Sequence, residues 1–225
     1  MQLHFAGEGD GRKLASLYDT GIDEVPDWVW ERRSLESLNL SQNFLTELPA
    51  QIGELRELRM LDLGHNALAD LPGELRRLWK LEYLYLSDNP LGALPASAAS
   101  LPGLRYLAAS AIGLETLLEE IGSLPNLEEL RLDGNRLTSL PDSVGELASL
   151  RELSLRSNQF TRVPPALARL ARLEHLDLRA NRLVALPPWL AQLPGLTKLD
   201  ARWNGLEASQ PVAIALAARG CRVLL

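Results

Sequence analysis

The chain is poor in cysteine, in positive charge and in long apolar runs. Cys221 is the single cysteine among 225 residues, which excludes an internal disulfide and a cysteine-based zinc site and indicates a reducing compartment. Lys and Arg number 23 against 29 Asp and Glu, giving a formal net charge of −6 that does not favour nucleic acid or an anionic membrane. No stretch approaches the roughly 20 uninterrupted apolar residues of a transmembrane helix. We therefore expect neither a nucleic-acid nor a membrane partner.

Targeting and catalytic motifs are also missing from the sequence. The first 12 residues have no apolar run behind a basic start, so no signal peptide is predicted. The stretch from Gly7 to Gly11 lacks the following Lys and Ser or Thr of a phosphate-binding loop. The histidines His4, His65 and His175 are scattered along the chain, with no nucleophile arranged beside them. We expect no catalytic site, no metal and no cofactor, and hence no enzyme.

What the chain has in abundance is leucine at a fixed spacing. The pattern Leu-x-x-Leu-x-Leu-x-x-Asn-x-Leu-x-x-Leu-Pro recurs every 23 residues. Its clear copies begin at Leu35, Leu58, Leu81, Leu127, Leu150 and Leu173. A fixed period of this length is typical of a stacked solenoid, which presents a surface rather than a pocket.

The period defines nine units without an insertion. With Leu35 as position 0, the units start at residues 12, 35, 58, 81, 104, 127, 150, 173 and 196. The sequence predicts a single domain over residues 1–225 with three parts. These are an N-terminal capping region at 1–34, regular repeats at 35–208, and a C-terminal capping helix and strand within 209–225. Divergent end units are expected, because an array must cover its exposed core at both ends.

Each unit can be understood as one coil of the solenoid. Leu at positions +3 and +5 alternates with polar residues, which predicts a short strand with one face inward. Stacked neighbours bury the leucines, at about 1.5–3 kcal/mol for each fully buried side chain. Asn at +8 follows the strand, where its amide can satisfy the backbone of a tight buried turn. Pro at +14 is expected to open a return segment of one helical turn, so the parallel sheet lines the concave side.

These residues resemble the leucine-rich-repeat family, specifically its 23-residue class. Residues 48–55 and 140–147 match the Leu-Pro-x-x-Ile-Gly-x-Leu signature of that class closely, and the likeness covers about residues 12 to 210. The resemblance implies an α/β horseshoe that binds a partner protein without catalysis. Similar arrays occur in bacterial cytosolic proteins, in bacterial effectors delivered into host cells, and in plant and animal proteins that bind Ras-like GTPases. A cytoplasmic location, or delivery into a host cell, is therefore expected.

One unit, residues 104–126, departs from the pattern. Ile112 replaces Asn at +8, Leu118 replaces Pro at +14, and the segment 116–121 has a more helical pattern than its counterparts. Two interpretations are open: drift in one repeat, with Ile112 joining the core, or a local change of curvature that shapes a binding surface. Loss of the Asn leaves turn groups to water or to neighbouring coils, at about 1–3 kcal/mol if they stay unsatisfied.

All four tyrosines occupy strand positions that are predicted to face solvent. Tyr83 and Tyr106 lie at +2, Tyr85 at +4 and Tyr18 at +6, and Met60 at +2 extends the patch. Because strands lie about 4.8 Å apart, Tyr83, Tyr85 and Tyr106 are expected within roughly 5–10 Å of one another. Exposed Tyr and Met on a rigid sheet are typical of an interface hot spot, although aromatic residues also favour strands in general.

A row of arginines marks the C-terminal part of the same face. Arg156, Arg179 and Arg202 occupy +6 of successive units, Arg131 lies at +4, and Trp203 stands at the end of the row. One interpretation is a docking stripe for an acidic or phosphorylated partner. The other is a solvated face whose arginines are compensated by Asp and Glu at positions +2 and +4.

Position +1 alternates in charge at every step of the array. Its residues are Lys13, Glu36, Arg59, Glu82, Arg105, Glu128, Arg151 and Glu174. Parallel stacking places each of these charges beside two of opposite sign, at about 0.2–1 kcal/mol for each exposed pair. We expect this ladder to favour the correct stacking over a slip of one coil.

Three functional hypotheses follow. The first is an interaction module that binds a folded protein on the concave sheet, and the resemblance makes a small GTPase or a kinase-like signalling protein a candidate partner. The second is a substrate-recruiting or host-directed bacterial effector-type module that serves an enzyme on another chain. The third is a structural or designed repeat without a partner, against which the irregular unit and the clustered tyrosines argue.

Overall fold

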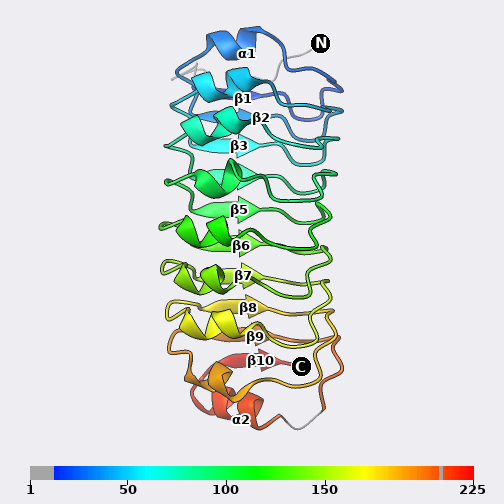
Figure 1. Cartoon of the computed structure of the whole chain (residues 1–225), viewed down its shortest axis with the longest axis vertical. Coiled ribbons are helices and arrows are strands. Elements are labelled where there is room, and N and C mark those ends of the chain that lie inside the picture. The colour runs from blue at the N-terminus through cyan, green and yellow to red at the C-terminus, as the bar shows by residue number, and fades with distance from the viewer. Residues whose placement is uncertain (1–12, 208–209) are drawn as a thin grey trace.

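The computed structural model describes residues 13–207 and 210–225, which form one elongated stack of coils (Figure 1). Within these residues, ten parallel strands make a single sheet, and each strand pairs with its neighbours in sequence order. The strands are β1 (Leu14–Ser16), β2 (Ser37–Asn39), β3 (Met60–Asp62), β4 (Tyr83–Tyr85), β5 (Tyr106–Ala108), β6 (Glu129–Arg131), β7 (Glu152–Ser154), β8 (His175–Asp177), β9 (Lys198–Asp200) and β10 (Arg222–Leu224). The predicted solenoid of about nine repeats is confirmed.

Short helical turns run along the other side of the stack, in front of the strands in Figure 1. They are α1 (Trp28–Glu31), the 3-10 helices η1 (Ala50–Glu54), η2 (Gly73–Arg77), η3 (Ala98–Ser100), η4 (Glu119–Ser123), η5 (Asp142–Glu146), η6 (Pro165–Arg169) and η7 (Pro188–Gln192), and α2 (Pro211–Ala218). The return segment of one helical turn is thus confirmed. The helix and strand expected near the C-terminus are α2 and β10, whereas His4 and the stretch from Gly7 to Gly11 lie outside the described residues.

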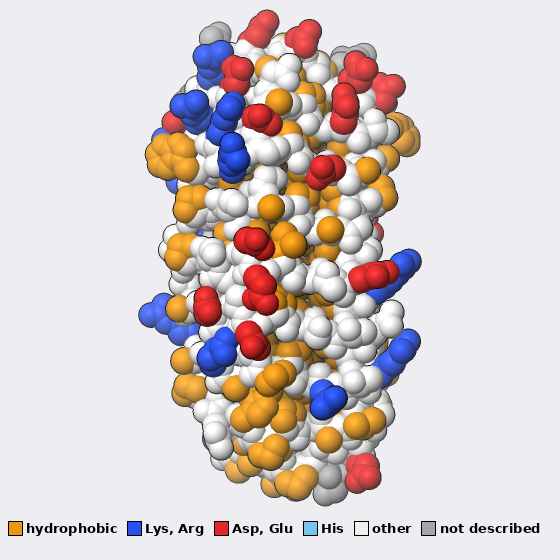
Figure 2. Space-filling model, viewed as in Figure 1, with side chains coloured by type: hydrophobic (Ala, Val, Ile, Leu, Met, Phe, Trp, Pro, Cys, Tyr) orange, Lys and Arg blue, Asp and Glu red, His pale blue; other side chains and the backbone are white. Residues whose placement is uncertain are grey.

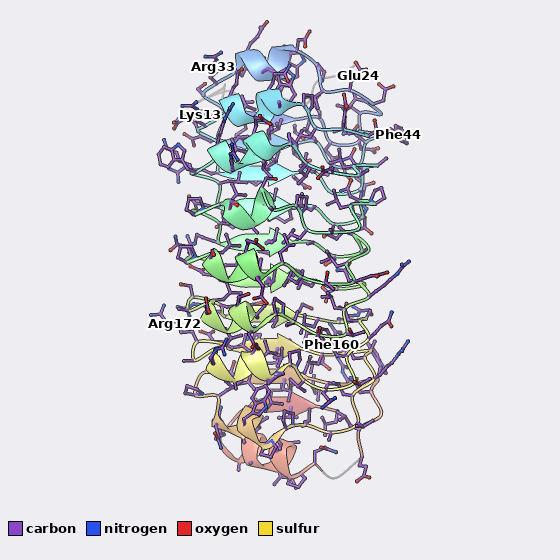
Figure 3. The ribbon with its side chains drawn as sticks, viewed as in Figure 1. Lys13, Glu24, Arg33, Phe44, Phe160 and Arg172 are labelled. Carbon is purple, nitrogen blue, oxygen red and sulfur yellow. The ribbon has the colours of Figure 1, made fainter. Side chains whose placement is uncertain are left out.

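The core is a column of aliphatic side chains that runs the length of the stack. Strand partners are one repeat apart, so Leu38 pairs with Leu61 and Leu61 with Leu84, and all three are fully buried. Phe160 takes a leucine position and is equally buried, inside the stack in Figure 3. Each core side chain is therefore covered by the coils before and after it, and no coil has a core of its own.

The irregular unit keeps the backbone of its neighbours. Leu118, at the proline position, has φ −67° and ψ 146°, close to the −64° and 150° of Pro49. The helix that follows begins at Glu119 and is as long as the one after Pro49, so the expectation of a more helical segment at 116–121 is wrong. Stacking on the coils at either side imposes this geometry without the proline. Ile112 is buried in the core, as the first interpretation proposed.

Asparagine side chains at position +8 hold the turn that follows the strand in seven of the nine units. Asn158 Nδ2 donates to the carbonyl oxygens of Leu155 and Leu132 at 3.1 and 2.9 Å, and Asn158 Oδ1 accepts from the Leu137 N–H at 3.0 Å. Equivalent donations to the carbonyl at +5 come from Asn43, Asn66, Asn89, Asn135, Asn181 and Asn204. Leu155 O also accepts from Asn181, so two successive asparagines share one carbonyl. The predicted role of position +8 is confirmed.

Ile112 interrupts this row of asparagines, but the Leu86 and Ala109 carbonyl groups beside it still accept hydrogen bonds. Leu86 O still accepts from Asn89, and Ala109 O still accepts from Asn135, each at 2.9 Å. The neighbouring coils supply these partners, as one of the two alternatives anticipated. However, each of these carbonyls has one asparagine where the regular units provide two.

The residue at position +7, just before the asparagine position, reverses the chain with a left-handed backbone. Position +7 has φ between 52° and 66° in all nine units. Only Gly134 in this position is a glycine, so eight other residues, His65 and Trp203 among them, accept a conformation that costs roughly 1–2 kcal/mol. The stacked turns on either side stabilise this geometry. Side chains at +7 consequently stand on the rim of the sheet.

The stack has two long edges with different side chains (Figure 3). We call them the strand-start edge, where Lys13, Arg33 and Arg172 lie, and the strand-end edge, where Glu24 and Phe44 lie. Phe44 is 68% exposed on the strand-end edge.

The alternating charges at +1 pair along the strand-start edge. Glu82 lies 2.6 Å from Arg59 and 3.9 Å from Arg105, and Arg105 also lies 2.8 Å from Glu128. Further pairs at this position are Lys13–Glu36 and Arg151–Glu174. The predicted ladder is therefore present for most of its length, on side chains that remain partly exposed.

We predict that Asn135→Ala destabilises the protein more than Asn158→Ala. Asn135→Ala leaves the Ala109 carbonyl without an asparagine and the buried Ile112 N–H without its acceptor, whereas each carbonyl released by Asn158→Ala keeps a second asparagine. The difference in free energy of unfolding should be about 1–3 kcal/mol for each of these two buried groups. Urea denaturation of the two variants measures it, and equal losses would contradict the sharing of carbonyls.

We also predict that Glu82→Arg lowers the melting temperature. The new cation would lie between Arg59 and Arg105, which replaces attraction by repulsion worth about 1 kcal/mol or less at each contact. The loss should be larger at low salt, where screening is weaker. Glu120→Arg is the matched control, because Glu120 is exposed and forms no ion pair in the described part of the chain. A ladder that matters only for solubility would give the same melting temperature for both variants.

Candidate functional site

The face of the sheet opposite the helices carries the candidate site, and we call it the sheet face. Successive side chains of a strand point to opposite sides, so positions +2 and +4 lie on this face while +3 enters the core. In β4, Tyr83 is exposed, Leu84 is buried and Tyr85 is half-buried, as this alternation requires. The sheet face is turned away from the viewer in Figure 1.

Two tyrosines of β4, Tyr83 and Tyr85, and one of β5, Tyr106, form one cluster. The ring centroids of Tyr85 and Tyr106 are 4.9 Å apart, and those of Tyr83 and Tyr106 are 6.4 Å apart. Met60 is the strand partner of Tyr83 and extends the cluster by one coil. The spacing predicted from the sequence is therefore confirmed. Such tilted pairs add about 0.5–1.5 kcal/mol beyond the area that they bury.

The irregular unit shapes this cluster. Ala108 is the strand partner of Tyr85, and its short side chain leaves room for the Tyr106 ring beside it. Arg131 also lies over the Tyr106 ring, with its guanidinium carbon 5.8 Å from the ring centroid. Burial raises the pKa of Tyr85 and of Tyr106 above the ordinary tyrosine value, which already lies well above neutral pH, so both hydroxyl groups are protonated and can donate hydrogen bonds. Sequence reasoning missed Ala108, because a small residue gives no signal of its own.

Most arginines of the predicted row are already paired. Arg179 Nε lies 2.8 Å from Asp177 Oδ2 and 3.6 Å from Asp200 Oδ2, and Arg131 Nε lies 2.5 Å from Glu129. Hydrogen bonding to Asp177 raises the pKa of Arg179 against the effect of burial.

Arg156 and Trp203 are the two members of the row whose side chains form no ion pair within the described residues. Arg156 is exposed and lacks such a pair because Ser154 stands at the position that Asp177 and Asp200 take in the next two units. Trp203 is 64% exposed, and its ring centroid lies 5.4 Å from the guanidinium carbon of Arg202 and 6.0 Å from that of Arg179. The ion pairs favour the self-compensated interpretation of this row over a free docking stripe.

Asp200 is the buried charge of this network, with 4% of its surface exposed. Arg202 contacts both carboxylate oxygens, with Nε 2.9 Å from Oδ1 and Nη2 2.7 Å from Oδ2. Burial acts to raise the pKa of the Asp200 carboxyl, but the hydrogen bonds from Arg202 outweigh it and hold the pKa below its ordinary value. This bidentate pair fixes Arg202 at the end of the row.

Two shallow hollows open on the sheet face. One, of about 270 Å³, lies over β6 to β9 among acidic and basic side chains in similar numbers. The other, of about 280 Å³, lies nearer the N-terminus. It is lined by Tyr18, Ser41, Gln42, Asp62, Gly64, His65, Tyr85 and Ser87. Asp62 was not among the predicted site residues, although its place beside Tyr85 in the +4 column was a signal that could have shown it.

Within residues 13–207 and 210–225, no three Asp, Glu, His or Cys side chains are grouped so that they could hold a metal ion. In the same part of the chain, none of the helices has the length and apolar character needed to cross a bilayer.

A sequence model of one protein family matches the chain. The family is described as leucine rich repeat, and the matches cover residues 33–91, 125–183 and 148–206, together more than half of the chain. The unmatched interval between them holds most of the irregular unit. No curated protein matches the chain.

Solved structures of the same architecture are similar to it. A leucine-rich-repeat protein of Leptospira interrogans has 28% identity and a TM-score of 0.74, over 91% of this chain and 58% of that one. The ectodomain of the plant membrane receptor kinase GASSHO1/SCHENGEN3 from Arabidopsis thaliana, in complex with CASPARIAN STRIP INTEGRITY FACTOR 2, has 34% identity and a TM-score of 0.67, over 83% and 23%. Internalin C2 from Listeria monocytogenes shares the fold at 23% identity and a TM-score of 0.66, over 95% and 79%. The chain thus spans less than two thirds of the first two proteins.

We predict that Asp200→Asn removes stability that depends on pH. Because the pKa is lowered in the folded state, the carboxylate stabilises the fold above its unfolded-state pKa, and this contribution is lost as the pH falls through the folded-state pKa. Near neutral pH the variant should lose about 1.5–3 kcal/mol, the worth of hydrogen bonds to a charged group. Below about pH 4 the gap to wild type should narrow. Urea denaturation at both pH values measures it, and a constant gap would contradict this account.

Proposed function

The chain belongs to the leucine-rich-repeat family, and from this premise we propose that it is a non-catalytic module that binds a partner protein on its sheet face. The leucine-rich-repeat fold is a general protein–protein interaction module, and the family is generally without enzymatic activity. The plant ectodomain, solved in complex with another factor, is an example in which such an array holds a partner.

One observation carries the proposal. Tyr106 packs against both Tyr83 and Tyr85 on the sheet face, outside the leucine core, and Met60 adjoins Tyr83. The rings are held by a rigid sheet and lose little conformational freedom when a partner covers them, which is typical of residues that dominate binding energy. The cluster is the anchor in this proposal.

The arginine row has a secondary role. Arg131, Arg179 and Arg202 already bind carboxylates of their own strands, so a partner would gain little net energy from them. Arg156 and the exposed Trp203 are the members of the row that stay open to contact. We therefore propose that Arg156 and Trp203 orient the partner on the sheet face, while the tyrosines supply most of the binding energy.

The class of partner is part of the proposal. A small GTPase or a kinase-like signalling protein fits a folded partner of this kind, and a reducing cytoplasm suits a chain whose one cysteine is buried and unpaired. The substrate-recruiting or effector-type role remains the alternative, in which the same surface would serve an enzyme on another chain.

The proposal predicts that the combined variant Tyr83→Ala, Tyr85→Ala, Tyr106→Ala loses its partner. Affinity capture from lysate of the source organism should recover the partner with wild type and little or none with the variant, because truncation of even one hot-spot residue costs about 2 kcal/mol or more, which is about thirtyfold in affinity. Trp79→Ala is the matched control, since Trp79 is 55% exposed at position +21, away from the sheet face.

The melting temperature decides how a loss is interpreted. Equal melting temperatures for both variants and wild type would attribute the loss to the tyrosine surface. A partner retained at full strength would remove the sheet-face proposal. It would direct attention to an apolar hollow of about 560 Å³ on the strand-end edge, lined by Val163, Pro164 and Trp189 among others.

A further inference from the structure

On the sheet face and the strand-end edge, the ratio of acidic to basic side chains differs between the N-terminal and C-terminal halves of the array. Positions +2 to +14 comprise the strand, its turn and the strand-end edge of each unit. In the five units from 12 to 104 they hold eight acidic residues and no Lys or Arg, whereas in the four units from 127 to 196 they hold six acidic residues and eight Lys or Arg. The eight acidic residues are Asp19, Asp23, Glu24, Glu47, Asp62, Asp70, Asp88 and Glu115. Figure 2 shows acidic side chains gathered at the upper right and basic ones at the lower right.

Most of the eight carboxylates in the N-terminal half are not paired with a cation of the chain's described residues. Six of them form no ion pair in the described part of the chain. The exceptions are Asp88, 3.5 Å from His65 Nδ1, and Glu115, 3.5 Å from Arg136. In the C-terminal half, by contrast, Asp and Arg bind each other directly. The N-terminal half therefore keeps a negative potential that a partner of opposite sign can use.

The hollow of about 280 Å³ lies in this acidic half and joins a carboxylate to aromatic rings. Asp62 Oδ1 accepts a hydrogen bond from the Gly64 N–H at 3.0 Å, and the carboxylate forms no ion pair within the described residues. Tyr85 is the strand partner of Asp62, and Tyr18, 55% exposed, lines the hollow as well. A cation in this hollow would meet one negative charge and the faces or edges of two rings.

We propose that this hollow receives an arginine or lysine side chain of the partner protein. The inference rests on the proposed function and names the chemistry of the partner: a basic surface with adjoining apolar groups. The cation pairs with Asp62 and stacks on Tyr85, while the apolar groups cover Met60 and Tyr83. Arginine suits the site best, because its planar guanidinium pairs and stacks at once. A partner of this kind is opposite in charge to the acidic one considered for the arginine row.

The test is an NMR titration of the full chain with two short peptides. Acetyl-Gly-Leu-Arg-Leu-Gly-amide supplies the cation, and the same peptide with citrulline in place of arginine keeps the shape without the charge. With the arginine peptide, amide shifts should be confined to β1 to β5 and should weaken with added salt. The citrulline peptide should bind about threefold to tenfold more weakly, since it loses both the ion pair and the cation–π contact.

Asp62→Asn identifies the anion. Asn39 occupies the same position one unit earlier, where its Oδ1 accepts from the Ser41 N–H at 2.9 Å, so an amide is compatible with this turn. The variant should bind the arginine peptide about threefold to fivefold more weakly and the citrulline peptide unchanged. Glu120→Gln removes the same charge from the helical side and should change neither.

The outcomes separate this inference from the function on which it rests. Equal binding of both peptides, or shifts centred on β6 to β9, would overturn the cation subsite. The sheet-face function would still stand if the tyrosine variant lost its captured partner. If that variant kept its partner, the proposed function would fail. An arginine-selective, Asp62-dependent titration would then still establish the subsite as a property of the surface.

Discussion

The structure depends on one constraint, which is that each residue stacks on its equivalent one repeat away. Leu61 lies between Leu38 and Leu84, and the same step recurs along the sheet. No coil has a core of its own, so burial, turn geometry and the shared asparagine bonds all require neighbours in register. A coil with weaker local chemistry can therefore be held in shape by the coils beside it, and the left-handed residues at +7 persist for the same reason.

The irregular unit shows both sides of this constraint. Its backbone follows its neighbours although Leu118 replaces the proline and Ile112 replaces the asparagine. Because the scaffold tolerates these changes, the side chains of the same unit are free to differ on the sheet face. In this unit Tyr106 and Ala108 face outward from the same strand. The short side chain of Ala108 leaves space in which the rings of Tyr85 and Tyr106 contact each other. The departure from the repeat lies where the candidate binding surface is.

Charge is arranged in two ways along the array. Where Asp and Arg lie two residues apart in the same unit, as Asp177 and Arg179 do, they bind each other and leave little attraction for a partner. Where acidic residues stand alone, as Asp62 does beside Tyr85, the potential is available for binding. A count of arginines suggests a basic docking stripe, but a paired arginine and an unpaired one differ in what they offer, and only distances distinguish them.

The sequence by itself determined the architecture. The 23-residue period predicted the sheet, the return turns, the asparagine turns, the charge ladder and the distance between the tyrosines, because a solenoid converts position in the repeat directly into position in space. The more helical segment expected at 116–121 was wrong, since local propensity yielded to stacking at Leu118. The hollow at Asp62, the pairing of the arginines and the place left by Ala108 were decided by the tertiary structure alone. They depend on which side chains of different coils come within contact distance, and spacing along the chain does not specify rotamers or partners.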